Sequence, residues 1–254
     1  KMKKILVFAQ ANSKYSRRIL KYLSTQNKLK VSIIIFSRDS IIENIKKCLS
    51  SYEIKPNAFL DSKPHKNVKI RNLVKKSKIN LAISTSYTHI IDNKFLKLFS
   101  EGVINLHPSA LPFNRGCHHG FWGIMDGTHH GCTMHYMDNK IDAGKIIDQI
   151  KFKNSQEITA EEVFRRSHNL MLVILKKNLK LIANNKLKKK KQKKGSYHSR
   201  KMIIKKSTLN INEKISVDFL WRLLRATRIK NHGYFIKINN KKFKIISKII
   251  KTQK

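Results

Sequence analysis

The first half of the chain alternates short apolar runs with amphipathic segments, and this alternation constrains the fold more than any other feature. The apolar runs have the length of strands and occupy residues 5–8, 31–36 and 81–84. The segments between them, residues 16–24, 40–49 and 67–76, space their apolar residues as helices do. Strands that are apolar on both faces and alternate with helices predict a Rossmann-like α/β fold, with a mostly parallel sheet covered by helices on both faces.

The serines near the first two amphipathic segments are candidate helix caps. Ser13 or Ser16 suits the N-terminus of the first helix, and Ser37 to Ser40 suits that of the second. Thr159 and Glu162 form the pattern of a capping box at the start of a long helix that reaches about residue 183.

Further strands are predicted near residues 102–105, 131–135 and 145–150. After Gly195 the pattern changes to a helix over 217–225 and two short strands over 234–239 and 242–246. Asn239-Asn240 between these strands suits the tight turn of a β-hairpin. We therefore expect a catalytic domain over residues 1–194 and a small C-terminal region, helix plus β-hairpin, over 195–254.

The apolar run near the N-terminus and the sparse cysteines indicate the cellular compartment in which the protein works. Residues 5–9 form a run of five, shorter than the ~7–15 apolar residues of a secretory signal, so a buried first strand is favoured. No apolar run approaches the roughly 20 residues that span a bilayer. Cys48, Cys117 and Cys132 lie far apart, which argues against a disulfide framework. A cytoplasmic protein without a membrane anchor is predicted.

The chain of 254 residues carries a formal charge of +40. The densest basic run, residues 186–194, has no interleaved aromatic side chains to stack bases and is predicted to be a solvated loop. A surplus of Lys, Asn and Ile also follows from an AT-rich genome. An anionic partner, such as a phosphate-bearing substrate, nucleic acid or membrane surface, is the alternative explanation.

The residues best suited to chemistry lie between 102 and 149. Asn105 and His107 stand two apart on a predicted strand and so share a face, and Pro108 ends the strand behind His107. With Asp142, they supply an amide, an imidazole and a carboxylate, a set that suits acyl transfer to an amine. A histidine before proline can also be structural, and Asp142-Ala143-Gly144 can be an ordinary turn in which glycine supplies positive φ.

The whole block closely resembles the family of formyltransferases that use 10-formyltetrahydrofolate. The resemblance rests on Asn-Leu-His-Pro-Ser-Ala-Leu-Pro over 105–112, on Arg115-Gly116, and on residues 131–135 and 141–149 in the expected order. It implies the formyltransferase fold and makes Asn105, His107 and Asp142 the catalytic residues. It also implies direct transfer, with neither a metal nor a covalent enzyme intermediate.

The resemblance also suggests where the folate co-substrate binds. Ser86, Tyr87 and Ile91 look like part of the family's pterin loop, and Met137 and Asp138 are expected to close the other side. Plain core packing is the alternative for Tyr87 and Ile91.

The acceptor is inferred from departures within the family. Residues 10–13 after the first strand contain no glycine, where the ribonucleotide enzymes carry a glycine-rich phosphate loop. The region after Gly195 is short for the β-barrel of the tRNA enzymes. It resembles instead the sugar-nucleotide members, at residues 196–198, 217–227 and 233–235.

Candidate substrate contacts are spread over several motifs. Arg222 and Arg225 lie three apart on one predicted helical face, so both can meet one anion, the alternative being a solvated basic face. The other candidates are Arg115, His118 and Tyr197. The histidine pairs 118–119 and 129–130 lack zinc-ligand spacing, so no metal is expected.

The sequence therefore predicts an N-formyltransferase that acts on a nucleotide-linked amino sugar. The favoured acceptor is a dTDP-4-amino-4,6-dideoxyhexose used for surface polysaccharide, as in lipopolysaccharide O-antigen. One alternative is a methionyl-tRNA formyltransferase-like enzyme, and another is a nucleic-acid-binding protein on an inactive scaffold; nucleic acid is the disfavoured partner.

A homodimer is predicted through the C-terminal hairpin, because a lone hairpin is marginal in water. Its apolar positions are Phe235, Ile238, Phe243, Ile245 and Ile246.

Overall fold

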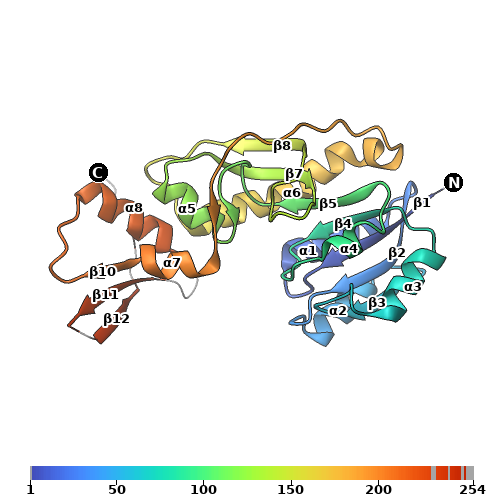
Figure 1. Ribbon diagram of the computed structural model, residues 1–254, viewed down its shortest axis with the longest axis horizontal. Coiled ribbons are helices and arrows are strands. Elements are labelled where there is room, and N and C mark those ends of the chain that lie inside the picture. The colour runs from blue at the N-terminus through green and yellow to red at the C-terminus, as the bar shows by residue number, and fades with distance from the viewer. Residues whose placement is uncertain (1, 230–232, 240, 247–248, 250–254) are drawn as a thin grey trace. The chain divides into compact units, whose positions relative to one another are not determined.

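The computed structural model describes residues 2–229, 233–239, 241–246 and 249, and the chain divides into two compact units (Figure 1). Unit 1 comprises residues 1–107, 133–149 and 169–192, and unit 2 comprises residues 108–132, 150–168 and 193–254. The boundary expected at 194/195 lies close to the last passage between the units, at 192/193. As a boundary between catalytic and C-terminal regions it stays a prediction.

A seven-stranded sheet runs in the order β3-β2-β1-β4-β5-β7-β8 (Figure 1). The strands β3, β2, β1, β4 and β5 are all parallel, and β7 pairs with β5 in the antiparallel sense. The mostly parallel sheet expected from the apolar runs is thus confirmed. Its strands are β1 (Lys3–Ala9), β2 (Leu29–Phe36), β3 (Asn57–Leu60), β4 (Leu81–Thr85), β5 (Gly102–His107), β7 (His130–Tyr136) and β8 (Ile146–Phe152).

The chain builds this sheet outward from β1 to β3 and then returns to the other side of β1 with β4. Such a reversal of strand order opens a crevice at the carboxyl ends of the strands, where α/β proteins bind ligands. At this edge β4 is followed by Ser86 and β5 ends in His107. The fold therefore brings the predicted pterin loop and the predicted catalytic strand to the same edge.

Four helices of unit 1 connect these strands: α1 (Lys14–Ser24), α2 (Ile42–Leu49), α3 (Val68–Lys76) and α4 (Asn93–Leu96). Ser13 caps α1 by accepting a hydrogen bond from the Ser16 amide. The cap expected for the second helix is wrong, because Ile41 occupies the N-cap position of α2 without a side-chain bond. Ser40 instead bonds Gln10 and Ala11 and so holds the loop after β1.

The core of unit 1 explains why the apolar runs could be recognised as strands. Ile5 to Ala9 are all fully buried, as expected for a strand with helices on both faces. Leu6 and Phe8 pack with Ile33 and Ile35 of the neighbouring strand in one cluster. At about 25 cal/mol per Å² of apolar area, burial on this scale is the main stabilising contribution to the unit.

The long helix α6 (Ala160–Ala183) and the strands β7 and β8 each continue from one unit into the other. The Glu162 amide donates to Thr159 Oγ1, as the predicted capping box requires. The Glu162 carboxylate pairs with Arg166 one turn later. Thr159 therefore caps α6 as predicted, whereas the Glu162 side chain stabilises the first turn through an ion pair.

Unit 2 holds the remaining elements. They are β6 (Arg115–Gly116), α5 (His119–Met125), β9 (Tyr197–His198), α7 (Arg200–Lys206), β10 (Thr208–Asn210), α8 (Val217–Thr227), β11 (Tyr234–Ile238) and β12 (Lys241–Ile245). The predicted hairpin is confirmed as the antiparallel pair β11–β12. It is completed by β10, which runs parallel to β11 and makes a three-stranded sheet. Much of the partner surface that the hairpin needs thus comes from its own chain.

The core of unit 2 gathers around α5. Phe121 and Trp122 pack with Val163 of α6 and with Leu223 of α8 in one cluster. No described helix combines the length and the apolar character needed to cross a membrane.

Two histidines of β7, His130 and His135, are buried. Burial lowers the pKa of His130 and of His135 to about 4 each, from the ordinary 6.5. His130 is 2% exposed and packs against Phe152. In the unfolded chain each imidazole takes up a proton near pH 6.5, so the unfolded state binds more protons than the folded one between about pH 6.5 and 4.

We expect the free energy of unfolding to fall as the pH drops through this window. The pKa change of His130 corresponds to roughly 3 kcal/mol. Thermal unfolding of His130→Asn should therefore depend less on pH between 7 and 5 than that of the parent protein. His129→Asn is the matched control, because His129 is exposed. Identical pH dependence of the two variants would contradict the expectation.

Candidate active site

The end of β5 places two polar side chains on one face of the strand. Asn105 and His107 stand two residues apart, and β7 pairs beside them with Asn105 opposite His135 and His107 opposite Thr133. Directly opposed residues of an antiparallel pair point to the same face. The register therefore adds His135 to the predicted pair.

Asp142 completes a cluster of four side chains in unit 1. Its Oδ2 lies 3.7 Å from His107 Nδ1, and its Oδ1 lies 3.7 Å from His135 Nε2. Asn105 Nδ2 lies 3.2 Å from His135 Nε2 and 3.5 Å from Asp142 Oδ1. The three residues predicted to be catalytic are thus brought together, with a second imidazole between them.

His135 sets the orientation of the Asn105 amide. Its Nδ1 lies 2.8 Å from the Tyr136 carbonyl oxygen, which can only accept, so Nδ1 carries a proton. Because burial holds the pKa of His135 at about 4, the ring is neutral near pH 7 and Nε2 is an acceptor. Asn105 Nδ2 must donate to that nitrogen. The amide NH₂, and not the amide oxygen, therefore faces the cluster.

This geometry leaves one hydrogen of the Asn105 amide weakly engaged. The contact with Asp142 is 3.5 Å long, at the outer limit of a hydrogen bond. A stronger acceptor, such as a carbonyl oxygen that gains negative charge, would take that hydrogen in preference. Asn105 is thus arranged to stabilise an oxyanion.

Sequence reasoning named only Asn105, His107 and Asp142. His135 went unassigned because its role depends on the antiparallel pairing of β5 and β7, whereas the other strands of this sheet region are parallel. The usable signal was its spacing: His135 and Thr133 alternate with the fully buried Cys132 and Met134.

The carboxylate reaches the cluster from an unusual backbone conformation. Asp142 has φ of +51°, in the left-handed region, whereas Gly144 is not in that region. The alternative of an ordinary turn in which glycine supplies the positive φ therefore does not describe this segment. Gly144 is needed for space, because a Cβ there would overlap the Tyr136 carbonyl oxygen.

The predicted pterin loop follows β4 directly. Ser86 has φ of +54°, and its Oγ is buried with no hydrogen-bond partner among the described residues, as is Thr85 Oγ1. Tyr87 donates to the Asp61 carbonyl oxygen at 2.7 Å, and its ring is tilted by 57° against that of Phe8. Two unsatisfied hydroxyls beside a partly buried ring fit a heterocyclic ligand that carries amide groups.

The other predicted folate contacts differ in their surroundings. Ile91 is 4% exposed and lies within the core cluster of unit 1, so the alternative of plain packing accounts for it. Met137 packs against the same cluster while only partly buried. Asp138 Oδ1 accepts a bond from the Lys140 amide and shapes the loop that leads to Asp142.

The loop after β1 satisfies its own amides with side chains. The Ala11 amide donates to Ser40 Oγ, and the Asn12 amide donates to Gln10 Oε1. These are amides that a phosphate would need at such a loop. Their engagement agrees with the missing glycines in disfavouring a phosphate at this place.

Two predicted substrate contacts of unit 2 lie side by side. β6 and β9 pair in parallel, with Arg115 opposite Tyr197 and Gly116 opposite His198. Tyr197 is half exposed, at 49%, and an Arg115 guanidinium nitrogen donates to the Lys193 carbonyl oxygen. His118 precedes α5 in the left-handed conformation, with φ of +58°. Residues 82 positions apart in the chain thus form one small surface.

The two arginines of α8 have other partners. Arg225 is 4% exposed, and its guanidinium donates to the carbonyl oxygens of Ser155 and Ile158 at 2.8 and 3.1 Å. Arg222 forms an ion pair with Asp218 at 2.9 Å. The prediction that both arginines meet one substrate anion does not fit Arg225, because its side chain is buried and holds the backbone before α6.

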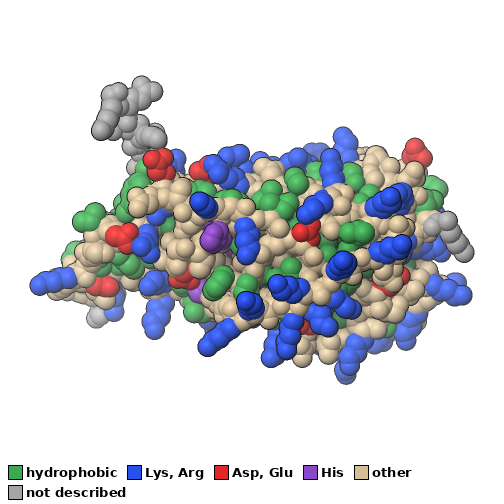
Figure 2. Space-filling view, turned by 90° about the horizontal axis from the view of Figure 1, so that it is seen from above, with side chains coloured by type: hydrophobic (Ala, Val, Ile, Leu, Met, Phe, Trp, Pro, Cys, Tyr) green, Lys and Arg blue, Asp and Glu red, His purple; other side chains and the backbone are tan. Residues whose placement is uncertain are grey.

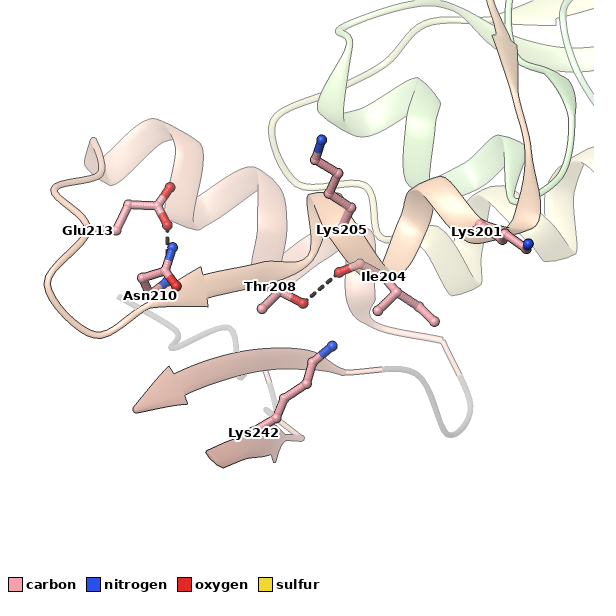
Figure 3. Close-up of a pocket in the computed structure, with 7 residues that line it drawn as sticks. All are labelled: Lys201, Ile204, Lys205, Thr208, Asn210, Glu213 and Lys242. Atoms are coloured by element: carbon pink, nitrogen blue, oxygen red, sulfur yellow. Dashed lines mark hydrogen bonds between the residues drawn. The ribbon is translucent and has the colours of Figure 1, made fainter. Parts of the chain in front are cut away.

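A separate open groove of about 620 Å³ lies in the C-terminal part of unit 2 (Figure 3). Lys201 and Lys205 of α7 and Lys242 of β12 line it, together with Glu213, which accepts from the Asn210 amide. None of the predicted site residues lines this groove. Within the described residues, no three His, Cys, Asp or Glu side chains are placed to hold a metal ion.

Comparison with known proteins shows which protein family this chain matches. Residues 3–179 match the family model described as formyl transferase. A methionyl-tRNA formyltransferase of Borrelia duttonii is 31% identical over 194 residues, which cover 70% of this chain and 62% of that protein. A GDP-perosamine N-formyltransferase of Brucella melitensis is 38% identical over 88 residues, 34% of each chain. The chain spans less than two thirds of the length of these curated relatives.

Solved structures with the same fold cover more of the chain. A 4-N formyltransferase from Francisella tularensis superposes with a TM-score of 0.83 at 22% identity, over 99% of both chains. An N-formyltransferase from Helicobacter canadensis, solved in complex with folinic acid and dTDP-3-aminofucose, superposes with a TM-score of 0.68 at 21% identity. That match covers 94% of this chain and 85% of the other.

Proposed function

This chain belongs to the formyl transferase family, and we propose that it transfers a formyl group from 10-formyltetrahydrofolate to the amine of a nucleotide-linked amino sugar. The observation that carries the proposal is the cluster of Asn105, His107, His135 and Asp142 at the carboxyl end of β5. The favoured acceptor is a dTDP-4-amino-4,6-dideoxyhexose. The enzyme would act in the cytoplasm, and its product would be used for surface polysaccharide synthesis.

The folate supplies the formyl group on its N10 atom, and the residues of the cluster act on that group. Asn105 donates its second amide hydrogen to the formyl oxygen as the acceptor amine adds to the formyl carbon. His107 stabilises the same negative charge, and Asp142, 3.7 Å from His107 Nδ1, orients its imidazole. The amine loses a proton and N10 gains one as the C–N10 bond breaks, so atoms and charges balance. Neutral His135 keeps Asn105 oriented throughout.

Ser86, Tyr87 and Met137 are proposed to line the folate site. The buried, unsatisfied hydroxyls of Thr85 and Ser86 support a ligand at this end of β4. The exposed Tyr197 and the neighbouring Arg115 are proposed to meet the acceptor. No role in the reaction is proposed for a metal.

The sugar-nucleotide acceptor is supported by solved structures that cover nearly all of the chain. The Francisella 4-N formyltransferase matches from end to end, and the Helicobacter enzyme was solved with a dTDP-linked amino sugar. Methionyl-tRNA formylation is the second candidate, which the identity to the Borrelia enzyme and the charge of +40 favour. Figure 2 shows Lys and Arg side chains spread among hydrophobic and other side chains on the face drawn.

Incubation with 10-formyltetrahydrofolate and a panel of acceptors tests the proposal. The panel contains dTDP-linked 3-amino and 4-amino sugars, GDP- and UDP-linked amino sugars, and methionyl-tRNA, with mass spectrometry to detect a formyl gain. Formylation of a nucleotide sugar, at a much lower rate in His107→Ala, is the expected result. Formylation of methionyl-tRNA alone would overturn the acceptor. Salt-sensitive RNA binding without folate binding would favour the inactive scaffold.

We also propose that the protein is a homodimer through its C-terminal sheet. Ile238, Phe243 and Ile246 are exposed in this part of unit 2, and a strand at a sheet edge offers unpaired backbone groups. An apolar surface beside such an edge favours association with a second copy.

Sedimentation of the full chain at micromolar concentration should reveal a dimer, and Phe243→Asp should convert it to a monomer. Val217→Asp is the matched control, since Val217 is 85% exposed on α8 and outside this sheet. If the parent protein were monomeric, the pairing of β11 with β10 within one chain would explain the apolar hairpin, and no dimer interface would be needed.

A further inference from the structure

The basic run after α6 is attached to unit 1 by its backbone. Lys190 exchanges two hydrogen bonds with Ile146, each 2.8 Å long, in an antiparallel bridge. The Lys189 ammonium lies 5.6 Å from the centre of the Tyr136 ring. Lys190 is therefore held to the start of β8, and the expectation of a solvated loop holds only for the lysine side chains of this run.

Gln192 is the half-buried residue among these exposed lysines. Its Nε2 donates to the carbonyl oxygens of Asp142 and Gly144, at 2.9 and 2.7 Å. One amide group thus uses both of its hydrogens to bind the backbone on either side of Ala143. The bound segment is the one that carries the site carboxylate.

The backbone that Gln192 binds is in an unfavourable conformation. A non-glycine residue at positive φ costs about 1–2 kcal/mol relative to the right-handed region. Asp142 has φ of +51°, so its placement depends on bonds that hold the segment in this form. Asp142 lies 3.7 Å from His107 Nδ1, and a rotation of the backbone would carry the carboxylate away.

We propose that Gln192 is a positioning residue that holds Asp142 against His107 through its two hydrogen bonds to the backbone. The proposal rests on the proposed function, since it assigns Gln192 a share in the same site. Gln192 has no contact with reacting atoms in this role and acts only through Asp142.

Two substitutions separate hydrogen bonding from packing. Gln192→Ala removes the side chain, and Gln192→Glu keeps its shape but replaces the donating NH₂ by an oxygen that the two carbonyl oxygens repel. Both should lower kcat roughly 10-fold without a matching change in KM, the scale of a catalytic group held out of place. Lys191→Ala is the matched control, because Lys191 is the exposed neighbour.

A double-mutant cycle tests whether the effect passes through Asp142. In an Asp142→Ala background, Gln192→Ala should cause no further loss of kcat, because no carboxylate remains to be positioned. A purely structural role would add its full effect in both backgrounds. Hydrogen–deuterium exchange of the unliganded protein provides a second readout, with faster exchange expected over residues 137–146 in Gln192→Ala than in Lys191→Ala.

The outcomes distinguish this proposal from the proposed function. An active parent enzyme whose Gln192 variants keep its kcat, or whose losses add to that of Asp142→Ala, overturns the role of Gln192 alone. A parent protein that formylates no acceptor overturns the proposed function, whereas unchanged exchange over 137–146 overturns the role of Gln192 even then.

Discussion

Replacing His107 by alanine should lower the rate of formyl transfer roughly 10²- to 10³-fold while the protein stays folded. In the proposed reaction, His107 stabilises the formyl oxygen as it becomes negative. Its side chain is buried beside Asp142 at the end of β5, where alanine offers no group that can donate to the formyl oxygen. Single-turnover kinetics with the accepted sugar nucleotide measure the loss directly.

Asn105→Ala and Asp142→Ala should give losses of at least ~10²-fold, and Asp142→Asn separates charge from shape. Circular dichroism and thermal unfolding check that each variant folds. The matched control is His129→Ala, which removes an exposed imidazole. Near-normal turnover in His107→Ala would show that the chemistry is assigned to the wrong residues.

Gly144→Ala should reduce kcat roughly 10- to 10²-fold and also lower the melting temperature. A methyl group at this position would overlap the Tyr136 carbonyl oxygen. The two backbone segments are also joined by a hydrogen bond from the Tyr136 amide to the Lys145 carbonyl oxygen. The segment can accommodate it only by moving, and Asp142 moves with it. A rate assay and a thermal melt on the same sample measure the two effects.

Lys140→Ala lies in the same loop but changes only an exposed side chain, so it should resemble the parent protein. If Gly144→Ala lowered the melting temperature but kept full activity, the position of the carboxylate would tolerate a backbone shift. The close placement of Asp142 would then be unimportant for the rate.

The parallel sheet could be predicted because the apolar runs of β1, β2 and β4 are largely buried on both faces. The short elements could not be predicted in the same way. Asn57–Leu60 forms an edge strand with exposed residues, and His119–Met125 is a helix of seven residues with two glycines, too short for a periodic pattern. The strands β6 and β9 have two residues each and are defined only by their pairing with one another.

The residues of the candidate site also divide into those with a local sequence signal and those without one. Asn105 and His107 were found because their spacing along one strand is local, and Asp142 because of the family motif. His135 and Gln192 were missed because they reach the site through pairings distant in the sequence, one across an antiparallel register and one across the bridge from Lys190 to Ile146. Arg225 was misjudged because an arginine on a helical face can equally bind buried carbonyl oxygens.

The attachment of the basic segment to β8 has a consequence for how the protein is made. Gln192 follows Asp142 by 50 residues, so a ribosome adding about 5–20 residues per second completes Asp142 roughly 3 to 10 seconds before it reaches Gln192. During that interval the nascent chain already contains Asn105, His107, His135 and Asp142 but lacks the amide that holds the Asp142 backbone. The site is therefore completed late in translation, after the sheet that carries it has been synthesised.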